Sequence, residues 1–238
     1  MHNRSQPASD RVIEVEGLAK SVEFNAILSA GGPPVDTLLE RARIDLGLDF
    51  LHYLPKTAAQ TSPWPVVQNV LNGGASSHID IFSEQDLAQN APALAEQAKI
   101  PLIATQAAVP TDRLVEDRGM VVHTATHVAL PGHEGVLVGG TLLNRNLHFI
   151  DTINDLVYRE SNADGARQGT ATLFLEDVRI STNVRLFEDV RALGTRVSAE
   201  VRGAVLDQGR TWLDRAFVVN DWYISGYLPI LDLSLIHI

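Results

Sequence analysis

The sequence predicts an α+β fold in which a long N-terminal helix precedes antiparallel strands. Apolar residues recur every three or four positions from Val12 to Ser29, which is the spacing of an amphipathic helix. Later in the chain, β-branched runs come in pairs separated by short turns, as in β-hairpins. With 238 residues, the chain is long enough for one large domain or for two modules of about 100 to 120 residues each.

Charge and composition exclude several classes of function. The formal net charge is −10 and no basic stripe is visible, so the chain lacks the clustered Lys and Arg that nucleic-acid binding needs. The same charge argues against adhesion to an anionic membrane. Because cysteine is absent, disulfides, thiolate metal sites and cysteine nucleophiles are excluded. No secretory leader and no membrane-spanning helix is visible, so we expect any membrane helices to lie outside this sequence.

The predicted N-terminal helix, Val12–Ser29, ends at Gly31-Gly32-Pro33-Pro34. In one interpretation, this helix packs on its own domain. A second helix is expected with Asp36 as its N-cap and Gly47 as its end. The elements that follow are expected in this order: the strand Leu48–Leu54, the short helix Trp64–Leu71, the strand Ser77–Phe82, a helix from a Ser83/Asp86 capping box to Ala98, the irregular stretch Pro101–Arg118, a hairpin of Met120–Ala129 with Gly135–Leu143, and the helix Asn144–Tyr158.

The segment Gly169–Pro229 carries the clearest pattern of the chain. Two β-branched and apolar runs are split by Glu176-Asp177, which predicts a hairpin, and a helix with one apolar face then ends at Gly209. Two further strands turn at Asn220-Asp221. The bounds expected for these elements are Thr170–Leu175, Val178–Asn183, Val197–Gln208, Trp212–Val219 and Trp222–Leu228.

Four landmarks of this segment, "DVRISTNV", "ALGTRV", "VLDQG" and "YISGYLPILD", resemble the Cache family of extracytoplasmic sensor domains. The resemblance extends in weaker form over Leu48 to Asn146, although a shared helix-then-strand order explains that echo equally well. It implies helices over residues 1–47 and then two tandem PAS-like antiparallel-sheet modules. These would be a membrane-distal module over 48–158 and a membrane-proximal module over 159–232.

The second module is expected to lack its last strand, because a PAS-like sheet has five strands and only four are found before Asp232. The tail Leu233–Ile238 resembles the translation of a sequencing-library adapter. We interpret it as non-native, which would make the chain a C-terminally truncated fragment.

The resemblance implies the small-molecule-sensing input domain of a transmembrane receptor, such as a sensor histidine kinase, on the periplasmic face of an inner-membrane protein. The ligand would be a carboxylate, an amino acid or an amine, and the N-terminal helix would form a homodimer. No cofactor and no metal is expected. The fragment itself is not expected to be an enzyme, because it has no G-x-S-x-G, no P-loop lysine and no H-E-x-x-H motif. A soluble periplasmic ligand-binding or interaction module and an α/β enzyme are the alternatives.

Candidate ligand-binding residues of the first module surround His123, in the middle of the expected sheet. An imidazole or a forked guanidinium there suits a carboxylate, and a carboxylate suits an amine. Each candidate also has a structural alternative: a satisfied core histidine, a salt bridge of Arg118 with Glu116 or Asp117, an N-cap at Asn144, or an exposed Asp80. The candidates are His123, Arg118, Asn144, Arg145 and Asp80.

Candidates of the second module are Arg179 and Tyr223, for which core packing is the alternative. Of the two predicted modules, we expect the first to hold the ligand pocket, around His123 and Arg145. A metal site is not expected there, since His123 and His127 would lie two pleats, about 13 to 14 Å, apart on one strand face.

Overall fold

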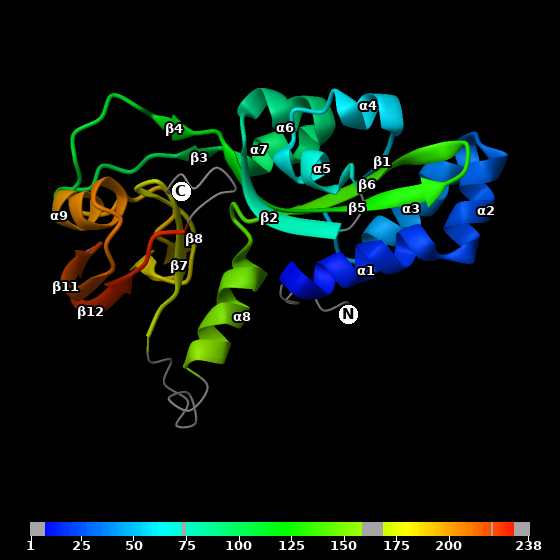
Figure 1. Ribbon diagram of the computed structural model, residues 1–238. Coiled ribbons are helices and arrows are strands. Elements are labelled where there is room, and N and C mark those ends of the chain that lie inside the picture. Colours follow the sequence, from blue (N-terminus) through cyan, green and yellow to red (C-terminus); the bar gives the residue numbers. More distant parts are fainter. Residues whose placement is uncertain (1–7, 73–74, 159–168, 220, 231–238) are drawn as a thin grey trace. The chain divides into compact units, whose positions relative to one another are not determined.

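The computed structural model describes residues 8–72, 75–158, 169–219 and 221–230, and it has the α+β fold that the sequence predicts (Figure 1). The chain divides into two compact units. The first unit is Met1–Asp80 with Val121–Leu142, and the second unit is Ile81–Met120 with Leu143–Ile238. The module ranges 1–47, 48–158 and 159–232 do not coincide with these units and remain a prediction of the sequence. The tail Leu233–Ile238 lies outside the described residues.

A four-stranded sheet forms the centre of the first unit. Its strand order is β1-β6-β5-β2, and the pairs β1–β6 and β5–β6 are antiparallel. The predicted hairpin turns at Pro131-Gly132, where Gly132 adopts a φ of 80°, a conformation that a residue without a Cβ reaches at no steric cost. The strands are β1 (Phe50–Pro55), β2 (Ala75–Phe82), β5 (Gly119–Leu130) and β6 (His133–Leu142).

Three helices cover one face of this sheet: α1 (Ala8–Lys20), α2 (Val22–Ala30) and α3 (Pro33–Asp45). The prediction of one continuous helix over Val12–Ser29 is wrong at Ser21. The Ser21 hydroxyl accepts a hydrogen bond from the Phe24 backbone N–H (3.1 Å) and caps a new helix, which is the preferred use of serine. Phe24 and Leu28 pack into a core cluster with Leu137, so these helices do pack on their own domain.

The start of α3 also differs from the prediction. Gly32 is the residue before its first turn, and Pro33 and Pro34 occupy the first helical positions, where a missing backbone N–H has no consequence. Asp36 therefore lies inside the first turn instead of capping the helix. A carboxylate at that place is still favourable, because the N-terminal end of a helix carries partial positive charge.

The opposite face of the sheet is covered by α4 (Lys56–Gln60) and α5 (Pro65–Val70). Successive side chains of a strand point to opposite faces. Leu51 of β1 accordingly packs with the helices α1 to α3, whereas Phe50 packs with Trp64, whose ring centroid is 6.4 Å away. The short helix predicted over Trp64–Leu71 is confirmed as α5.

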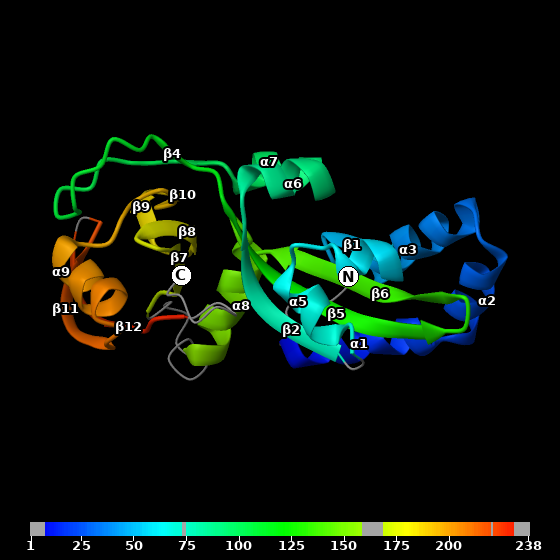
Figure 2. The same ribbon diagram turned by 45° about the horizontal axis from the view of Figure 1, so that its top comes forward.

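The second unit combines short helices with two-stranded ribbons (Figure 2). Its first helix has the predicted Ser83/Asp86 capping box, but it ends at Asn90 because Pro92 starts another helix and disfavours helical backbone just before it. The elements are α6 (Glu84–Asn90), α7 (Pro92–Ala98), β3 (Ile100–Pro101), β4 (Val115–Glu116), α8 (Leu147–Val157), β7 (Thr172–Leu175), β8 (Val178–Thr182), β9 (Arg185–Phe187), β10 (Val190–Arg191), α9 (Ala199–Arg202), β11 (Trp212–Val218) and β12 (Asp221–Tyr227).

Both hairpins predicted for the second unit are present, but the predicted turn at Asn220-Asp221 is misplaced by one residue, because Asp221 already belongs to β12. Leu175 pairs with Val178 across the Glu176-Asp177 loop, and Val218 pairs with Asp221. The predicted helix Val197–Gln208 starts at Ala199, and from Gly203 to Asp207 its backbone is a π-helix. In the described residues, β7–β8, β9–β10 and β11–β12 are separate antiparallel pairs. Val184, Val201, Val205 and other apolar side chains form their common core.

Gly140 provides a test of how tightly the first unit is packed. It lies between Phe50 of β1 and His123 of β5 in the strand register, and a Cβ there would be 2.5 Å from the Phe50 ring and 2.8 Å from Val121. We expect Gly140→Ala to lower the free energy of unfolding by ~1–3 kcal/mol through overpacking. The measurement is urea denaturation of the purified chain.

Gly17→Ala is the matched control for that substitution. Gly17 is exposed in α1 with nothing within 4 Å of the added Cβ, so the same change should stabilise the protein by ~0.5–1 kcal/mol. Equal effects of the two substitutions would contradict the packing described for Gly140.

Candidate functional site

His123 and Asp80 form a buried pair in the first unit. Strand β5 carries His123 and β2 carries Asp80, and the His123 Nδ1 lies 2.7 Å from the Asp80 carboxylate. His123 has no exposed surface and Asp80 has 7%. The rings of Trp64 and Phe50 meet the imidazole edge-on, with centroids 5.1 and 5.8 Å away. The structure thus brings two predicted candidates together, but in a place that solvent does not reach.

Burial lowers the pKa of His123 below its ordinary value of 6.5, although the hydrogen bond to Asp80 opposes this shift. The imidazole is therefore neutral at pH 7, and the Nδ1–H donates to the Asp80 carboxylate. This arrangement matches the structural alternative of a core histidine, here bonded through Nδ1.

Arg118 belongs to an ion-pair cluster of the second unit. Its guanidinium donates to Glu116 at 2.8 and 2.9 Å and to Glu176 at 2.7 Å. Burial by itself raises the pKa of the fully buried Glu116, but hydrogen bonds from Arg118 and Arg113 outweigh it and lower the pKa. The hydrogen bonds from Arg118 to Glu116 and Glu176 in turn raise the pKa of Arg118. Its donors are therefore engaged with the buried Glu116 and the partly exposed Glu176.

Asn144 lies buried where three backbone segments meet. Its side-chain oxygen accepts from Met120 N–H (2.9 Å), and its amide donates to the carbonyls of Ala98 (3.1 Å) and Arg118 (2.9 Å). Asn144 is not the N-cap of α8. That position is Asn146, whose side chain accepts a backbone N–H of the first turn at 3.1 Å.

Arg145, the next residue, is exposed and adopts a left-handed backbone conformation with a φ of 55°. Its backbone N–H donates to Ile180 (2.8 Å), and its guanidinium donates to the Lys99 carbonyl. Arg118, Asn144 and Arg145 are therefore all engaged in the second unit, and His123 and Asp80 belong to the first unit.

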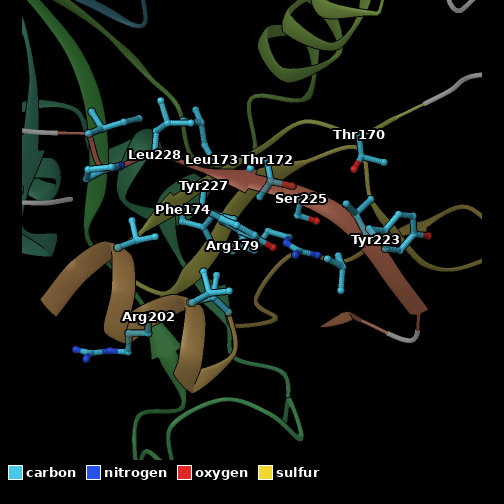
Figure 3. Close-up of a pocket in the computed structure, with 18 of the residues that line it drawn as sticks. Thr170, Thr172, Leu173, Phe174, Arg179, Arg202, Tyr223, Ser225, Tyr227 and Leu228 are labelled. Atoms are coloured by element: carbon cyan, nitrogen blue, oxygen red, sulfur yellow. The ribbon is translucent and has the colours of Figure 1, made fainter. Parts of the chain in front are cut away.

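A cavity of about 390 Å³ lies in the second unit (Figure 3). Strands β7, β8 and β12 and the helix α9 with its π-helical continuation form its walls. Both candidates predicted for the second module contribute to it. The residues that define its character are Phe174, Arg179, Val201, Val205, Tyr223 and Tyr227.

Arg179 is the unusual residue of this cavity. Its side chain is 3% exposed, and Nε and Nη1 are buried without a hydrogen-bond partner. Within the described part of the chain, no carboxylate forms an ion pair with it; its guanidinium lies over the Phe174 ring, 5.2 Å from the centroid. Burial lowers the pKa of Arg179 to about 10, so the group is still charged at pH 7. Figure 3 shows the side chain near those of Phe174, Tyr227 and Ser225.

The β7–β8 hairpin explains how Arg179 comes to face Phe174. The two are direct partners across the strands, next to a register shift between Leu173 and Phe174. A loop fixes the backbone of Arg179 from the other side: its N–H donates to Thr195 (2.9 Å) and its carbonyl accepts from Gly194 (2.9 Å). Gly194 has a φ of 78°, and a Cβ there would be 2.0 Å from a backbone oxygen, so only glycine fits this loop.

Comparison with known families gives a match over this part of the chain. Residues 141–235 match the family described as single Cache domain 3. This range contains every residue that lines the Arg179 cavity. The match covers less than half of the chain.

Cache domains, the class that this match names, are sensor domains that bind small-molecule ligands. Within the described residues, no helix is long and apolar enough to cross a membrane. The match is to a single Cache domain, and of the first predicted module, 48–158, it includes only residues 141–158.

The periplasmic domain of LuxQ from Vibrio cholerae matches over 92% of this chain and 91% of its own length, with 14% sequence identity and a TM-score of 0.40. No curated protein matches the chain in sequence.

Sequence reasoning missed Phe174 and Tyr227 as parts of the Cache cavity, although a signal for Phe174 existed. A two-residue loop at Glu176-Asp177 pairs Leu175 with Val178 and hence Phe174 with Arg179. Tyr227 has no such signal, because β12 reaches the cavity through tertiary packing, where its ring centroid lies 5.9 Å from that of Phe174.

The buried His123 gives the protein a pH dependence. A histidine whose pKa is lowered by folding binds fewer protons when folded, so its contribution to stability is present above pH 6.5 and is lost as the pH falls. We expect the fall in unfolding free energy between pH 7.5 and pH 5.5, measured with urea, to be smaller in His123→Gln than in the natural sequence. His148→Gln, at an exposed position of α8, is the control and should behave like the natural sequence. A fall of the same size in His123→Gln would contradict this assignment.

Proposed function

We propose that the cavity around Arg179 is the site at which this sensor domain binds its ligand. The observation that carries the proposal is an arginine that is 3% exposed, has no ion-pair partner among the described residues, and has Nε and Nη1 buried without a hydrogen-bond partner. Buried charges are ordinarily paired, because an unpaired charge loses its hydration without compensation. A ligand that enters the cavity would supply the missing partner.

The cavity has the size and composition of a small-molecule site. Such sites enclose about 300–1,000 Å³ and combine apolar walls with a few placed polar groups, and this cavity encloses about 390 Å³. Val201 and Val205 contribute apolar surface, and Tyr223, Ser225 and Tyr227 follow one another along one face of β12.

We infer a structural role for the candidates of the first module, which the sequence favoured. His123 is already bonded to Asp80 and has no exposed surface, so a ligand would reach it only after the packing of Trp64 and Phe50 opens. Arg118 and Asn144 are committed to buried partners in the same way. The tandem arrangement of two modules remains our proposal for the whole chain.

The receptor setting is also a proposal: a periplasmic input domain of an inner-membrane protein, joined to the membrane by helices outside this sequence. Binding would act on such a receptor only through a difference in affinity between its two signalling states. The cavity suits this task, because its wall includes a π-helical turn, Gly203–Asp207, and π-helical geometry is frequent at functional sites.

Substitution of Arg179 tests the proposal without knowledge of the ligand. In the free protein, Arg179→Met removes a buried charge that has no partner and keeps most of the side-chain volume. We expect the free energy of unfolding to rise by ~1–4 kcal/mol, since apolar replacement of buried ionic groups is neutral or stabilising by such amounts. Thermal and urea denaturation of the ligand-free chain measure this change.

Arg118→Met is the matched control, because it makes the same change at an arginine that is paired. It leaves the buried Glu116 short of a partner and should destabilise the protein by ~3–5 kcal/mol. A destabilisation by Arg179→Met of similar size would show that Arg179 is structural, and the proposed site would be abandoned.

We also propose a homodimer through the N-terminal helices, as the sequence predicts. Ile13 and Val22 are 66% and 85% exposed, whereas Val15 and Ala19 face the sheet of their own unit. Ile13→Glu with Val22→Glu should convert the dimer to a monomer in sedimentation-velocity experiments and leave the fold intact by circular dichroism. An unsubstituted chain that sediments as a monomer at about 100 µM, well above the Kd of a dimer held at −8 kcal/mol, would contradict this proposal.

A further inference from the structure

The charges that line the Arg179 cavity are not equivalent. Among the described residues, three charged ones line it: Glu176, Arg179 and Arg202. Arg202 donates to Asp207 at 2.8 Å and lies 3.7 Å from Asp177. Glu176 accepts from Arg118 at 2.7 Å. Among the described lining residues, the guanidinium of Arg179 is therefore the one charge that is not already neutralised within the protein.

The charges that line the cavity constrain the charge of the ligand in two ways. One uncommitted positive charge calls for one negative charge, and a guanidinium binds a carboxylate through two parallel hydrogen bonds. An ammonium group, by contrast, needs a carboxylate, and Glu176 is the acidic lining residue in the described part of the chain and is engaged with Arg118. A second carboxylate would need a second cation, and Arg202 is engaged with Asp207.

The surroundings of Arg179 describe the remainder of the ligand. The rings of Phe174 and Tyr227 lie with their centroids 5.9 Å apart, and Val201 and Val205 approach from the helix. Burial raises the pKa of Tyr227, although the charge of Arg179 opposes this, so its hydroxyl is protonated and neutral at pH 7. A wall of aromatic and branched aliphatic groups favours an apolar body, because burying apolar surface releases about 25 cal/mol per Å².

We propose that the ligand is an organic monocarboxylate, in which one carboxylate pairs with Arg179 and an apolar aliphatic or aromatic body fills the cavity between Phe174, Tyr227 and α9. Amines, amino acids and dicarboxylates are disfavoured by the same charges. This inference rests on the proposed function of the cavity and selects one ligand class for it.

The test compares matched compounds on the full 238-residue chain by thermal shift, followed by calorimetric titration. The monocarboxylates are butanoate, hexanoate, benzoate and 3-phenylpropanoate. Each is compared with its neutral amide and with the amine of the same carbon skeleton, and the panel also contains leucine, phenylalanine, succinate and glutarate. We expect at least one monocarboxylate to raise the Tm and its amide to bind about 10- to 100-fold more weakly, the range that follows from losing a charge-assisted hydrogen bond.

Substitutions at two arginines assign that binding to the cavity. Arg179→Met should weaken the monocarboxylate about 10- to 100-fold and its amide little. Arg179→Lys keeps the charge without the fork, so it should bind with intermediate affinity. Arg185→Met is the control, because Arg185 is 57% exposed outside the cavity, and it should bind like the natural sequence.

The possible failures separate the ligand class from the site. If amines, amino acids, dicarboxylates or neutral amides bind more tightly than the monocarboxylates and Arg179→Met alters their binding, the cavity is the sensor site and the monocarboxylate class is wrong. If a monocarboxylate binds equally to the natural sequence and to Arg179→Met, it binds elsewhere and the inference is overturned. If no compound of the panel binds, the monocarboxylate inference fails, and the stability of ligand-free Arg179→Met decides whether the cavity remains the proposed site.

Discussion

The second unit contains a buried arginine, Arg179, whose charged guanidinium is removed from solvent. Arg179 is buried on β8 with its guanidinium against the Phe174 ring and without an ion partner among the described residues. Cation–π contact returns only part of the lost hydration. The position is possible because the backbone is over-determined: the hairpin register fixes Arg179 opposite Phe174, and two hydrogen bonds to Gly194 and Thr195 fix it from the other side. The fixed backbone thus keeps the Arg179 guanidinium buried without an ion-pair partner, which a bound ligand would supply.

The first unit also buries a titratable side chain, but there the side chain is neutral. His123 is as deeply buried as Arg179. Burial lowers the pKa of His123, so its imidazole is neutral, and its Nδ1–H is bonded to Asp80. Gly140 makes room for the Phe50 ring beside it. Glu116 is a third case, a buried carboxylate that keeps its charge because two arginines surround it. His123 and Glu116 are thus buried groups whose charge is lost or paired within the protein, in contrast to Arg179, for which we propose a ligand as the partner.

Local patterns were sufficient to predict much of the fold and one part of the candidate site. The turns at Glu176-Asp177 and Pro131-Gly132 determine hairpin registers within a few residues, and a capping box at Ser83 determines a helix start, because these features depend on neighbours in sequence. The prediction of one continuous N-terminal helix was wrong at Ser21. Serine occurs both inside helices and as an N-cap, and the pattern of apolar residues does not distinguish the two. Arg179 and Tyr223 were recognised as candidates, but the preference between the modules depended on which polar residues find partners.

The sequence by itself determined the fold class, both hairpins of the sensor domain and the likeness to the Cache family, since turn residues, strand periodicity and short motifs are local properties. Only the tertiary structure decided that His123 is hydrogen-bonded to Asp80 and that the Arg118 guanidinium pairs with Glu116 and Glu176. It also decided that Arg179 is left without a partner among the described residues. The physical reason is that hydration and ion pairing depend on distances of a few ångströms between residues far apart in the chain, and no local pattern encodes those distances.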